Sequence, residues 1–200
     1  MTQNIYDDDG FFAGYATLAR STKGLDGAGE WPSICAMLPP LAGLRVADLG
    51  CGFGWFCRWA REQGAAQVVG LDLSEKMLAR AAADTSDPSI TYRRADLATL
   101  DLAAGGFNLA YSSLALHYLD SLDGVMAAVH AALAPGGHFV FSVEHPIYTA
   151  PSQPGFITAA DGRRVWPLDS YLLEGRRVTN WFAPDVVKYH RTITPSSESR

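Results

Sequence analysis

The stretch from Leu44 to Ala60 constrains the fold more than any other part of the chain. A short apolar run at 46–49 leads into the turn GCGFG at 50–54, and a helical pattern resumes after it. Three glycines in five residues allow positive φ angles and a close approach that a Cβ would block, and the next helix presents unpaired N–H groups. The sequence therefore predicts a buried strand, a tight turn and a helix, with a ligand lying against bare backbone.

Two classes of ligand use such a turn, and the spacing of the glycines separates them. Dinucleotide-binding turns read G-x-G-x-x-G/A, where the last small residue lets helix and strand pack closely. Trp55 takes that position here, and the acid Asp48 stands two residues before the first glycine. The run D-L-G-C-G-F-G resembles motif I of the class I S-adenosylmethionine (SAM)-dependent methyltransferases. An acid at the turn suits SAM, which carries an amino group and a sulfonium in place of phosphates.

Acids also follow the next two predicted strands. The strand at 67–72 ends in Asp72, whose carboxylate can accept both hydroxyls of a ribose, and the strand at 91–95 is followed by Asp96. The sequence A-D-L at this point resembles the family motif that binds the adenine amine. The resemblance implies a cofactor site made of Asp48, Gly50, Cys51, Gly52, Asp72, Leu73, Met77, Asp96, Leu97, Ser112, Tyr15 and Arg20. Several of these residues also have a purely structural interpretation, as a helix-terminal acid, a small turn residue, a packed ring or a solvated cation.

Further strands are predicted at 107–112 and 138–143, with helices at 55–63, 75–83 and 120–133. Strands that alternate with helices predict an α/β fold with a doubly wound, Rossmann-like parallel sheet, because each crossover is right-handed and places a helix on one face. We expect the strand order 3-2-1-4-5. The predicted acids then gather at the carboxyl ends of the strands, where such sheets bind ligands.

Length and composition favour one domain. Two hundred residues, 48% of them hydrophobic, suit a single core, divided into a helical cap (1–43), a SAM-binding core (44–145) and a substrate-side extension with a tail (146–200). A net charge of −5 offers no cationic surface for nucleic acid. The sequence shows no signal peptide or apolar run of ~18 residues, so we expect a cytoplasmic chain without a membrane partner. Neither the cysteine nor the histidine spacing predicts a metal site.

The resemblance implies transfer of the SAM methyl group to a small-molecule acceptor. The sulfonium is already an activated leaving group, so positioning and exclusion of water provide much of the catalysis. A general base is needed only when the acceptor carries a proton. His117 in the family-like run SLALHYL, its neighbour Tyr118, and His145 after the fifth strand are the candidate catalytic residues. Each histidine can instead be a hydrogen-bonded residue of the pocket wall.

Two other functions compete with this prediction. One is a nicotinamide-dependent oxidoreductase, which Trp55 disfavours; the other is a SAM-binding protein without turnover. The second alternative follows from the C-terminal part, which resembles ubiquinone/menaquinone-biosynthesis-like methyltransferases through E-H-P-I-Y and K-Y-H-R-T but lacks the pattern of the family's strands 6 and 7. We expect a hairpin at 176–182 and 186–193 and a disordered tail at 194–200. The uncovered edge strand predicts self-association.

Overall fold

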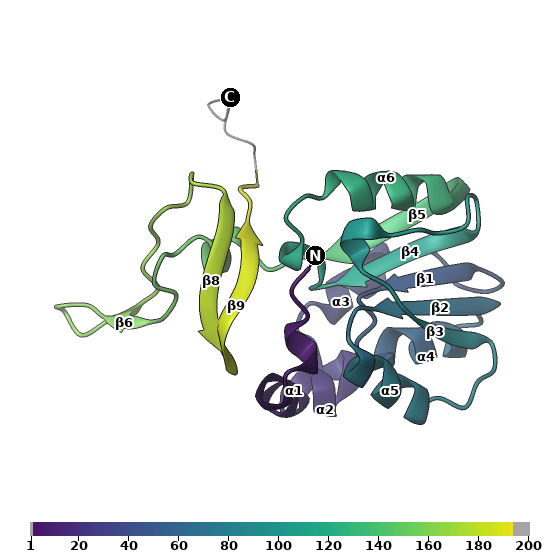
Figure 1. The fold of residues 1–200 in the computed structure, drawn as a ribbon, viewed down its shortest axis with the longest axis horizontal. Coiled ribbons are helices and arrows are strands. Elements are labelled where there is room, and N and C mark those ends of the chain that lie inside the picture. The colour runs from purple at the N-terminus through teal and green to yellow at the C-terminus, as the bar shows by residue number, and fades with distance from the viewer. Residues whose placement is uncertain (1, 194–200) are drawn as a thin grey trace.

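The computed structural model describes residues 2–193. Its centre is a parallel sheet of five strands in the order β3-β2-β1-β4-β5 (Figure 1). The strands are β1 (Arg45–Leu49), β2 (Gln67–Asp72), β3 (Ile90–Arg94), β4 (Phe107–Ser113) and β5 (Leu133–Ser142). All four neighbouring pairs are parallel. The predicted Rossmann-like fold and its strand order are therefore confirmed.

Helices cover both faces of the sheet, because alternate residues of each strand point to opposite sides. Val46 of β1 belongs to a core shared with α3 (Trp31–Met37) and α4 (Trp55–Glu62). Its neighbour Ala47 belongs to a second core shared with α6 (Asp123–Ala132). The remaining core helix, α5 (Glu75–Ala83), follows β2 and begins at Ser74, whose side chain accepts a hydrogen bond from the N–H of Met77.

Some boundaries differ from the sequence-based expectation. Before α3, the predicted helical cap consists of four short elements, η1 (Ile5–Asp7), α1 (Asp9–Ala16), α2 (Ala19–Thr22) and η2 (Gly24–Gly27). Two further short 3-10 helices follow strands, namely η3 (Leu97–Thr99) and η4 (Leu116–Tyr118). Strand β5 begins five residues before the predicted 138, because Leu133 already pairs with Phe107 and residues 134–137 form an irregularity in the strand.

The chain after the sheet forms α7 (Pro146–Thr149) and two small antiparallel sheets. One pairs β6 (Ile157–Thr158) with β7 (Arg164–Val165), and the other pairs β8 (Gly175–Trp181) with β9 (Ala183–His190). The predicted hairpin is confirmed, although its turn lies at Phe182, which has a positive φ of 57°, rather than at 183–185. Figure 1 shows this hairpin standing beside the parallel sheet, with the N-terminal segment between the two.

No additional strand joins the parallel sheet within residues 2–193, as expected. Strand β5 is an edge strand there, and the side chain of Phe141 on it is 41% exposed. Self-association through this edge stays a prediction. The predicted disordered tail, 194–200, lies outside the described residues.

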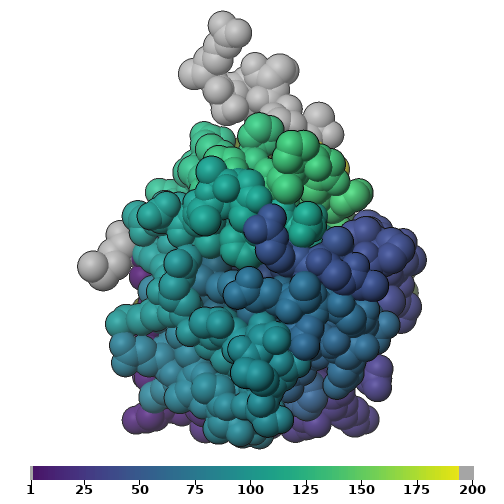
Figure 2. Space-filling view, turned by 90° about the vertical axis from the view of Figure 1, so that its right-hand side faces the viewer, coloured from purple at the N-terminus to yellow at the C-terminus, as the bar shows by residue number. Residues whose placement is uncertain are grey.

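Figure 2 shows the side of the molecule that faces away from the hairpin, where residues of the sheet and its helices, coloured blue to green, form the surface. The hairpin and the N-terminal segment both lie at the opposite side of the molecule (Figure 1). The two sides are therefore built from different parts of the chain. Among the described helices, none has both the length and the apolar character needed to cross a bilayer.

Candidate active site

A cavity of about 410 Å³ lies where the strands of the parallel sheet end. Four parts of the chain form its wall: the N-terminal segment 2–20, the glycine turn, residues at or just after the ends of β2, β3, β4 and β5, and the hairpin. A smaller cavity of about 90 Å³ lies beside it and shares Tyr15, Arg20, Gly50, Gly52 and Ser113 with it. The carboxyl edge of the sheet is therefore the hollow part of the molecule, as expected for a doubly wound fold.

The glycine turn leaves bare backbone on the cavity wall. Gly52 has a φ of +51°, and no heavy atom lies within 4 Å of the position that a Cβ would take, so a ligand can lie directly against the main chain. Gly54 serves packing instead, since a Cβ there would lie 2.1 Å from the hydroxyl oxygen of Tyr92. The two glycines thus meet different requirements within one turn.

Asp72 connects this turn to the end of β2. Its Oδ2 accepts a hydrogen bond from the N–H of Gly52 (2.8 Å) and its Oδ1 accepts one from the N–H of Ser74 (2.9 Å). Burial raises the pKa of Asp72, and these backbone donors act in the opposite direction. Each carboxylate oxygen has more than one acceptor position, so Asp72 can still accept two hydroxyl groups from a ligand.

Asp96 lies on the same wall, at the end of β3, and is met by the N-terminal segment. Its Oδ1 accepts hydrogen bonds from the hydroxyl of Thr2 (2.6 Å) and the N–H of Ala98 (2.9 Å). Burial alone would raise the pKa of Asp96, but the hydrogen bonds from Thr2 and Ala98 hold it below its ordinary value. The segment that contains Thr2 is therefore held against the cavity wall at the end of β3.

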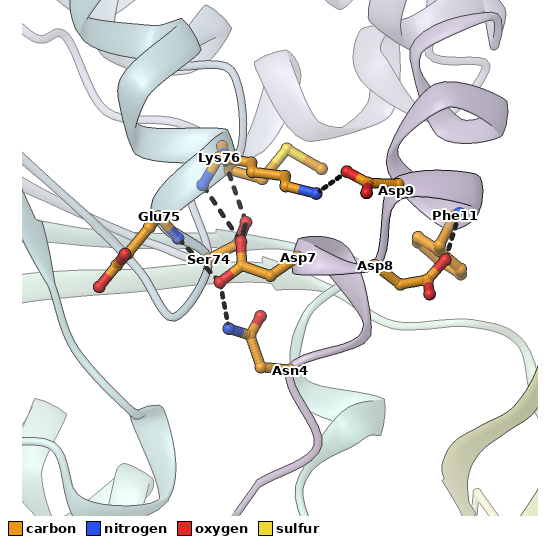
Figure 3. A network of polar contacts seen from close by, with 9 residues as sticks. Asn4, Asp7, Asp8, Asp9, Phe11, Ser74, Glu75 and Lys76 are labelled. Atoms are coloured by element: carbon orange, nitrogen blue, oxygen red, sulfur yellow. Dashed lines mark hydrogen bonds and ion pairs between the residues drawn. The ribbon is translucent and has the colours of Figure 1, made fainter.

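Asp7 fastens this segment to the core (Figure 3). Its Oδ1 accepts hydrogen bonds from the hydroxyl of Ser74 (2.5 Å) and the N–H of Lys76 (3.1 Å), at the first turn of α5. Its Oδ2 accepts from the side-chain amide of Asn4 (2.5 Å) and the N–H of Glu75 (3.3 Å). A carboxylate at a helix N-terminus meets unpaired N–H groups and a favourable dipole. Burial opposes ionisation, but these bonds lower the pKa of Asp7.

The smaller cavity contains the acid of the glycine motif. Asp48 is buried, and its Oδ2 accepts a hydrogen bond from the thiol of Cys57 at 3.2 Å. Burial raises the pKa of Asp48 to about 7. Arg20 and Glu30 form an ion pair of 2.8 Å on the wall of the same cavity. A cation and a buried acid with a raised pKa therefore line the smaller cavity beside the glycine turn.

The far end of the large cavity is lined by His117, Tyr118, Tyr6, Glu144 and Lys188. The Nδ1 of His117 accepts a hydrogen bond from the N–H of Glu144 at 3.4 Å. Burial, assisted by the charges of Lys188 and Arg191, lowers the pKa of His117 to about 3, so the ring stays neutral near pH 7. The hydroxyl oxygens of Tyr6 and Tyr118 lie 3.1 Å apart and share a hydrogen bond.

Comparison with known proteins identifies the type of site. The family described as methyltransferase domain matches residues 47–141. A crystal structure of an S-adenosylmethionine-dependent methyltransferase from Mesorhizobium loti is 64% identical, with a TM-score of 0.80, and the match covers 85% of this chain and 78% of that one. The chain belongs to the class I SAM-dependent methyltransferases. SAM is therefore its cofactor, and methyl transfer is its type of reaction.

Other relatives are less similar to this methyltransferase. An uncharacterised protein from Haemophilus influenzae is 34% identical over 197 residues, which cover 94% of this chain and 78% of that protein. A malonyl-[acyl-carrier protein] O-methyltransferase from Pectobacterium atrosepticum is 33% identical over 163 residues, which cover 77% of this chain and 54% of that protein. The match to this chain thus spans about half the length of the Pectobacterium atrosepticum protein.

The structure brings most of the predicted site residues of the methyltransferase together. The large cavity is lined by Gly50, Gly52, Asp72, Leu73, Met77, Asp96, Leu97, Tyr15, Arg20, His117 and Tyr118, and the smaller one by Asp48 and Cys51. Two predicted residues lie elsewhere. Ser112 is buried and donates a hydrogen bond to the carbonyl of Leu49 (2.7 Å), while its neighbour Ser113 reaches the cavity. His145 begins α7, where its Nδ1 accepts from the N–H of Ile147 (3.2 Å), outside the cavity wall.

Sequence reasoning missed the part of the wall that comes from distant segments. These residues are Thr2, Gln3, Asn4, Tyr6, Glu144, Trp181 and Lys188. Glu144 and Lys188 are the first residues of the family-like runs E-H-P-I-Y and K-Y-H-R-T, whereas the other five belong to no local motif. Gln3 reaches its place through hydrogen bonds with the carbonyl of Asp185 and the N–H of Val187. Within residues 2–193, the acids, cysteines and histidines form no group of three that could hold a metal ion.

Proposed function

We propose that this methyltransferase acts on a small-molecule acceptor, with the cofactor and the acceptor held at opposite ends of the large cavity. The observation that carries the proposal is the continuity of that cavity, from Asp72 and Asp96 at one end to His117 and Lys188 at the other. The enclosure of the acceptor end by Tyr6 and by Trp181 of the hairpin supports an acceptor of modest size.

The residues present fit SAM along its whole length. Asp72 faces the cavity with free acceptor positions for the ribose hydroxyls, and Asp96 can accept the adenine amine once it shares its oxygens with Thr2. Leu73 and Met77 add apolar surface for the ring. Arg20, beside the glycine turn, can pair with the carboxylate of the methionine part.

When bound, SAM supplies a methyl group that is already activated on a sulfonium. The chain's own residues then have to bind the acceptor, orient it in line and exclude water. Segment 2–8 and the hairpin contribute to the last task, since both line the cavity and Gln3 joins them by two hydrogen bonds. The similarity to malonyl-[acyl-carrier protein] O-methyltransferases supports oxygen as the acceptor atom in this chain.

Calorimetry with SAM, its demethylated product S-adenosylhomocysteine (SAH), NAD and NADP tests the cofactor assignment. We expect SAM and SAH to bind and the nicotinamide cofactors not to bind. A screen of small metabolites, read out as SAH formation, then tests turnover. Binding of SAM with no turnover of any metabolite would favour a SAM-binding protein, and binding of NAD would contradict the assignment.

A further inference from the structure

The acceptor end of the cavity has no group that is ready to take a proton. His117 is neutral, but its Nδ1 is occupied by the N–H of Glu144, and its pKa of about 3 makes it a poor base. Burial raises the pKa values of Tyr6 and Tyr118, so both phenols stay protonated near pH 7. An acceptor that arrives with a proton on its nucleophilic atom would find no partner among these three residues.

The remaining acid at this end is already engaged. The Oε2 of Glu144 lies 2.7 Å from the Nζ of Lys188, and the two side chains are only 28% and 12% exposed. Asp72 and Asp96 lie at the cofactor end and are held by backbone and hydroxyl donors. The acids that face the cavity therefore have assigned partners, and none of them is left over as a base.

Hydrogen-bond donors, in contrast, remain available at this end. Because Nδ1 of the neutral His117 ring accepts a bond, its hydrogen is on Nε2, which has no partner within the described part of the chain. Tyr6 and Tyr118 share one hydrogen bond, so one of their two hydroxyl hydrogens is free to donate. Lys188 has three N–H donors and gives one to Glu144, while its Nζ lies 5.0 Å from the centroid of the Trp181 ring.

From these groups we infer that the acceptor is a carboxylate, bound by Lys188, His117 and the Tyr6–Tyr118 pair and converted to a methyl ester. The inference rests on the proposed function and specifies its substrate class. A carboxylate is already ionised near pH 7 and needs donors rather than a base. Glu144 then acts as a positioning residue, which holds the Lys188 ammonium in place beside the ring of Trp181.

The chemistry balances without any further reactant. One carboxylate oxygen forms the new bond to the methyl carbon, and the carbon–sulfur bond breaks with its electron pair left on sulfur. The negative carboxylate and the positive sulfonium become a neutral ester and a neutral thioether, and no proton is released. An alcohol or amine acceptor would release one proton for each methyl group transferred.

Proton counting tests this difference directly. The protein is incubated with SAM and with matched probes, namely benzoate, phenylacetate and succinate against benzyl alcohol and benzylamine, in weakly buffered solution with a pH indicator. We expect SAH and methyl ester from at least one carboxylate, with no proton released per SAH. Methylation of the alcohol or the amine in preference to the acids would overturn the inference.

Binding to the SAH-loaded protein gives a second test that does not depend on turnover. A charged hydrogen bond of about 1.5–3 kcal/mol predicts a roughly tenfold to hundredfold loss of carboxylate affinity in Lys188→Met. Lys188→Arg should retain much of the affinity, and Lys23→Met, at an exposed lysine, should match the wild type. The double variant Lys188→Met/Glu144→Gln avoids an unpaired acid if the single variant folds poorly.

The two proposals fail in different ways. Affinity for SAM should be the same in all of these variants, and a wild-type protein that does not bind SAM would contradict the proposed function instead. Carboxylates that fail to bind the SAH-loaded wild type, or that bind Lys188→Met equally well, would overturn the inference about the acceptor.

Discussion

The two ends of the cavity are built in different ways. The cofactor end comes from residues 48–97, where three neighbouring parallel strands end side by side and the backbone itself supplies much of the surface. The acceptor end joins segments that are far apart in the sequence, as the hydrogen bond between Gln3 and Val187 shows. The geometry of the cofactor end depends on the strands of one sheet, whereas the geometry of the acceptor end depends on how the N-terminal segment and the hairpin pack against that sheet. The two ends should therefore respond differently to substitution.

The largest effect is expected at the cofactor end, for Asp72→Ala. Loss of two charged hydrogen bonds of about 1.5–3 kcal/mol each predicts a decrease in SAM affinity of roughly a hundredfold to ten-thousandfold. Calorimetry measures it, with Asp101→Ala at an exposed acid as the control. Asp96→Ala should lose less, because apolar contacts also hold the adenine. A larger loss for Asp96→Ala would reverse the ranking.

Substitutions at two glycines of the turn should have different effects, one on stability and the other on SAM binding. Gly54→Ala combines a positive φ, which costs about 1–2 kcal/mol, with a contact of 2.1 Å to Tyr92, so it should clearly lower the free energy of unfolding. Gly52 also has a positive φ, but the position that a Cβ would take is open. Gly52→Ala should therefore have a free energy of unfolding closer to that of the wild type and lose SAM affinity instead. Urea denaturation and calorimetry on both variants give the comparison. Equal unfolding free energies would argue against the packing role of Gly54.

A substitution in the hairpin should destabilise the hairpin without weakening SAM binding at the cofactor end. His190 is fully buried, with Nδ1 2.8 Å from the hydroxyl of Thr149 and Nε2 2.8 Å from the carbonyl of Tyr171. His190→Phe leaves polar groups without their partner, at about 1–3 kcal/mol for each. We expect faster hydrogen exchange in β8 and β9 with SAM affinity little changed, and Tyr189→Phe as a mild control. A large loss of SAM affinity would show that the two ends are coupled.

A pH dependence of the stability is expected to arise from Asp48. Its folded pKa of about 7 lies above the value of about 4 in an unfolded chain, so the folded state binds one more proton between these limits. The contribution of Asp48 to stability is therefore complete below about pH 4, falls as the pH rises towards 7, and is constant above that. Asp48→Asn should flatten this part of the profile, as measured by urea denaturation from pH 5 to about 8. An unchanged slope would contradict the assignment to Asp48.

Ligand binding offers a related check on the same acid. A cationic group of SAM near Asp48 favours its ionised form and lowers its pKa, so binding near pH 6.5 should release a fraction of a proton. Calorimetry in buffers with different ionisation enthalpies detects this release, and Asp48→Asn should abolish it. Release that persists in the variant would assign the proton to another group.

Local patterns in the sequence were enough for the cofactor end. The spacing of the glycines, the acids Asp72 and Asp96 after two apolar runs, and the helices between the strands predicted the order 3-2-1-4-5. These features could be predicted because parallel strands end on one edge, so residues at equivalent positions in successive strands become neighbours. One predicted residue at this end differs by one position. Side chains alternate along β4, so Ser112 points towards Leu49 and its neighbour Ser113 lines the cavity.

The tertiary structure alone decided the acceptor end. Tyr6 meets Tyr118 and Lys188 meets Glu144, in pairs separated by 112 and 44 residues. No sequence period or motif encodes such pairs, because they exist only when the N-terminal segment and the hairpin pack against the same edge of the sheet. The sequence by itself thus determined the fold and the kind of ligand, because short local patterns specify the strands, the glycine turn and the helices that form the cofactor end. The surroundings of the acceptor were decided by which distant side chains the completed fold buries together.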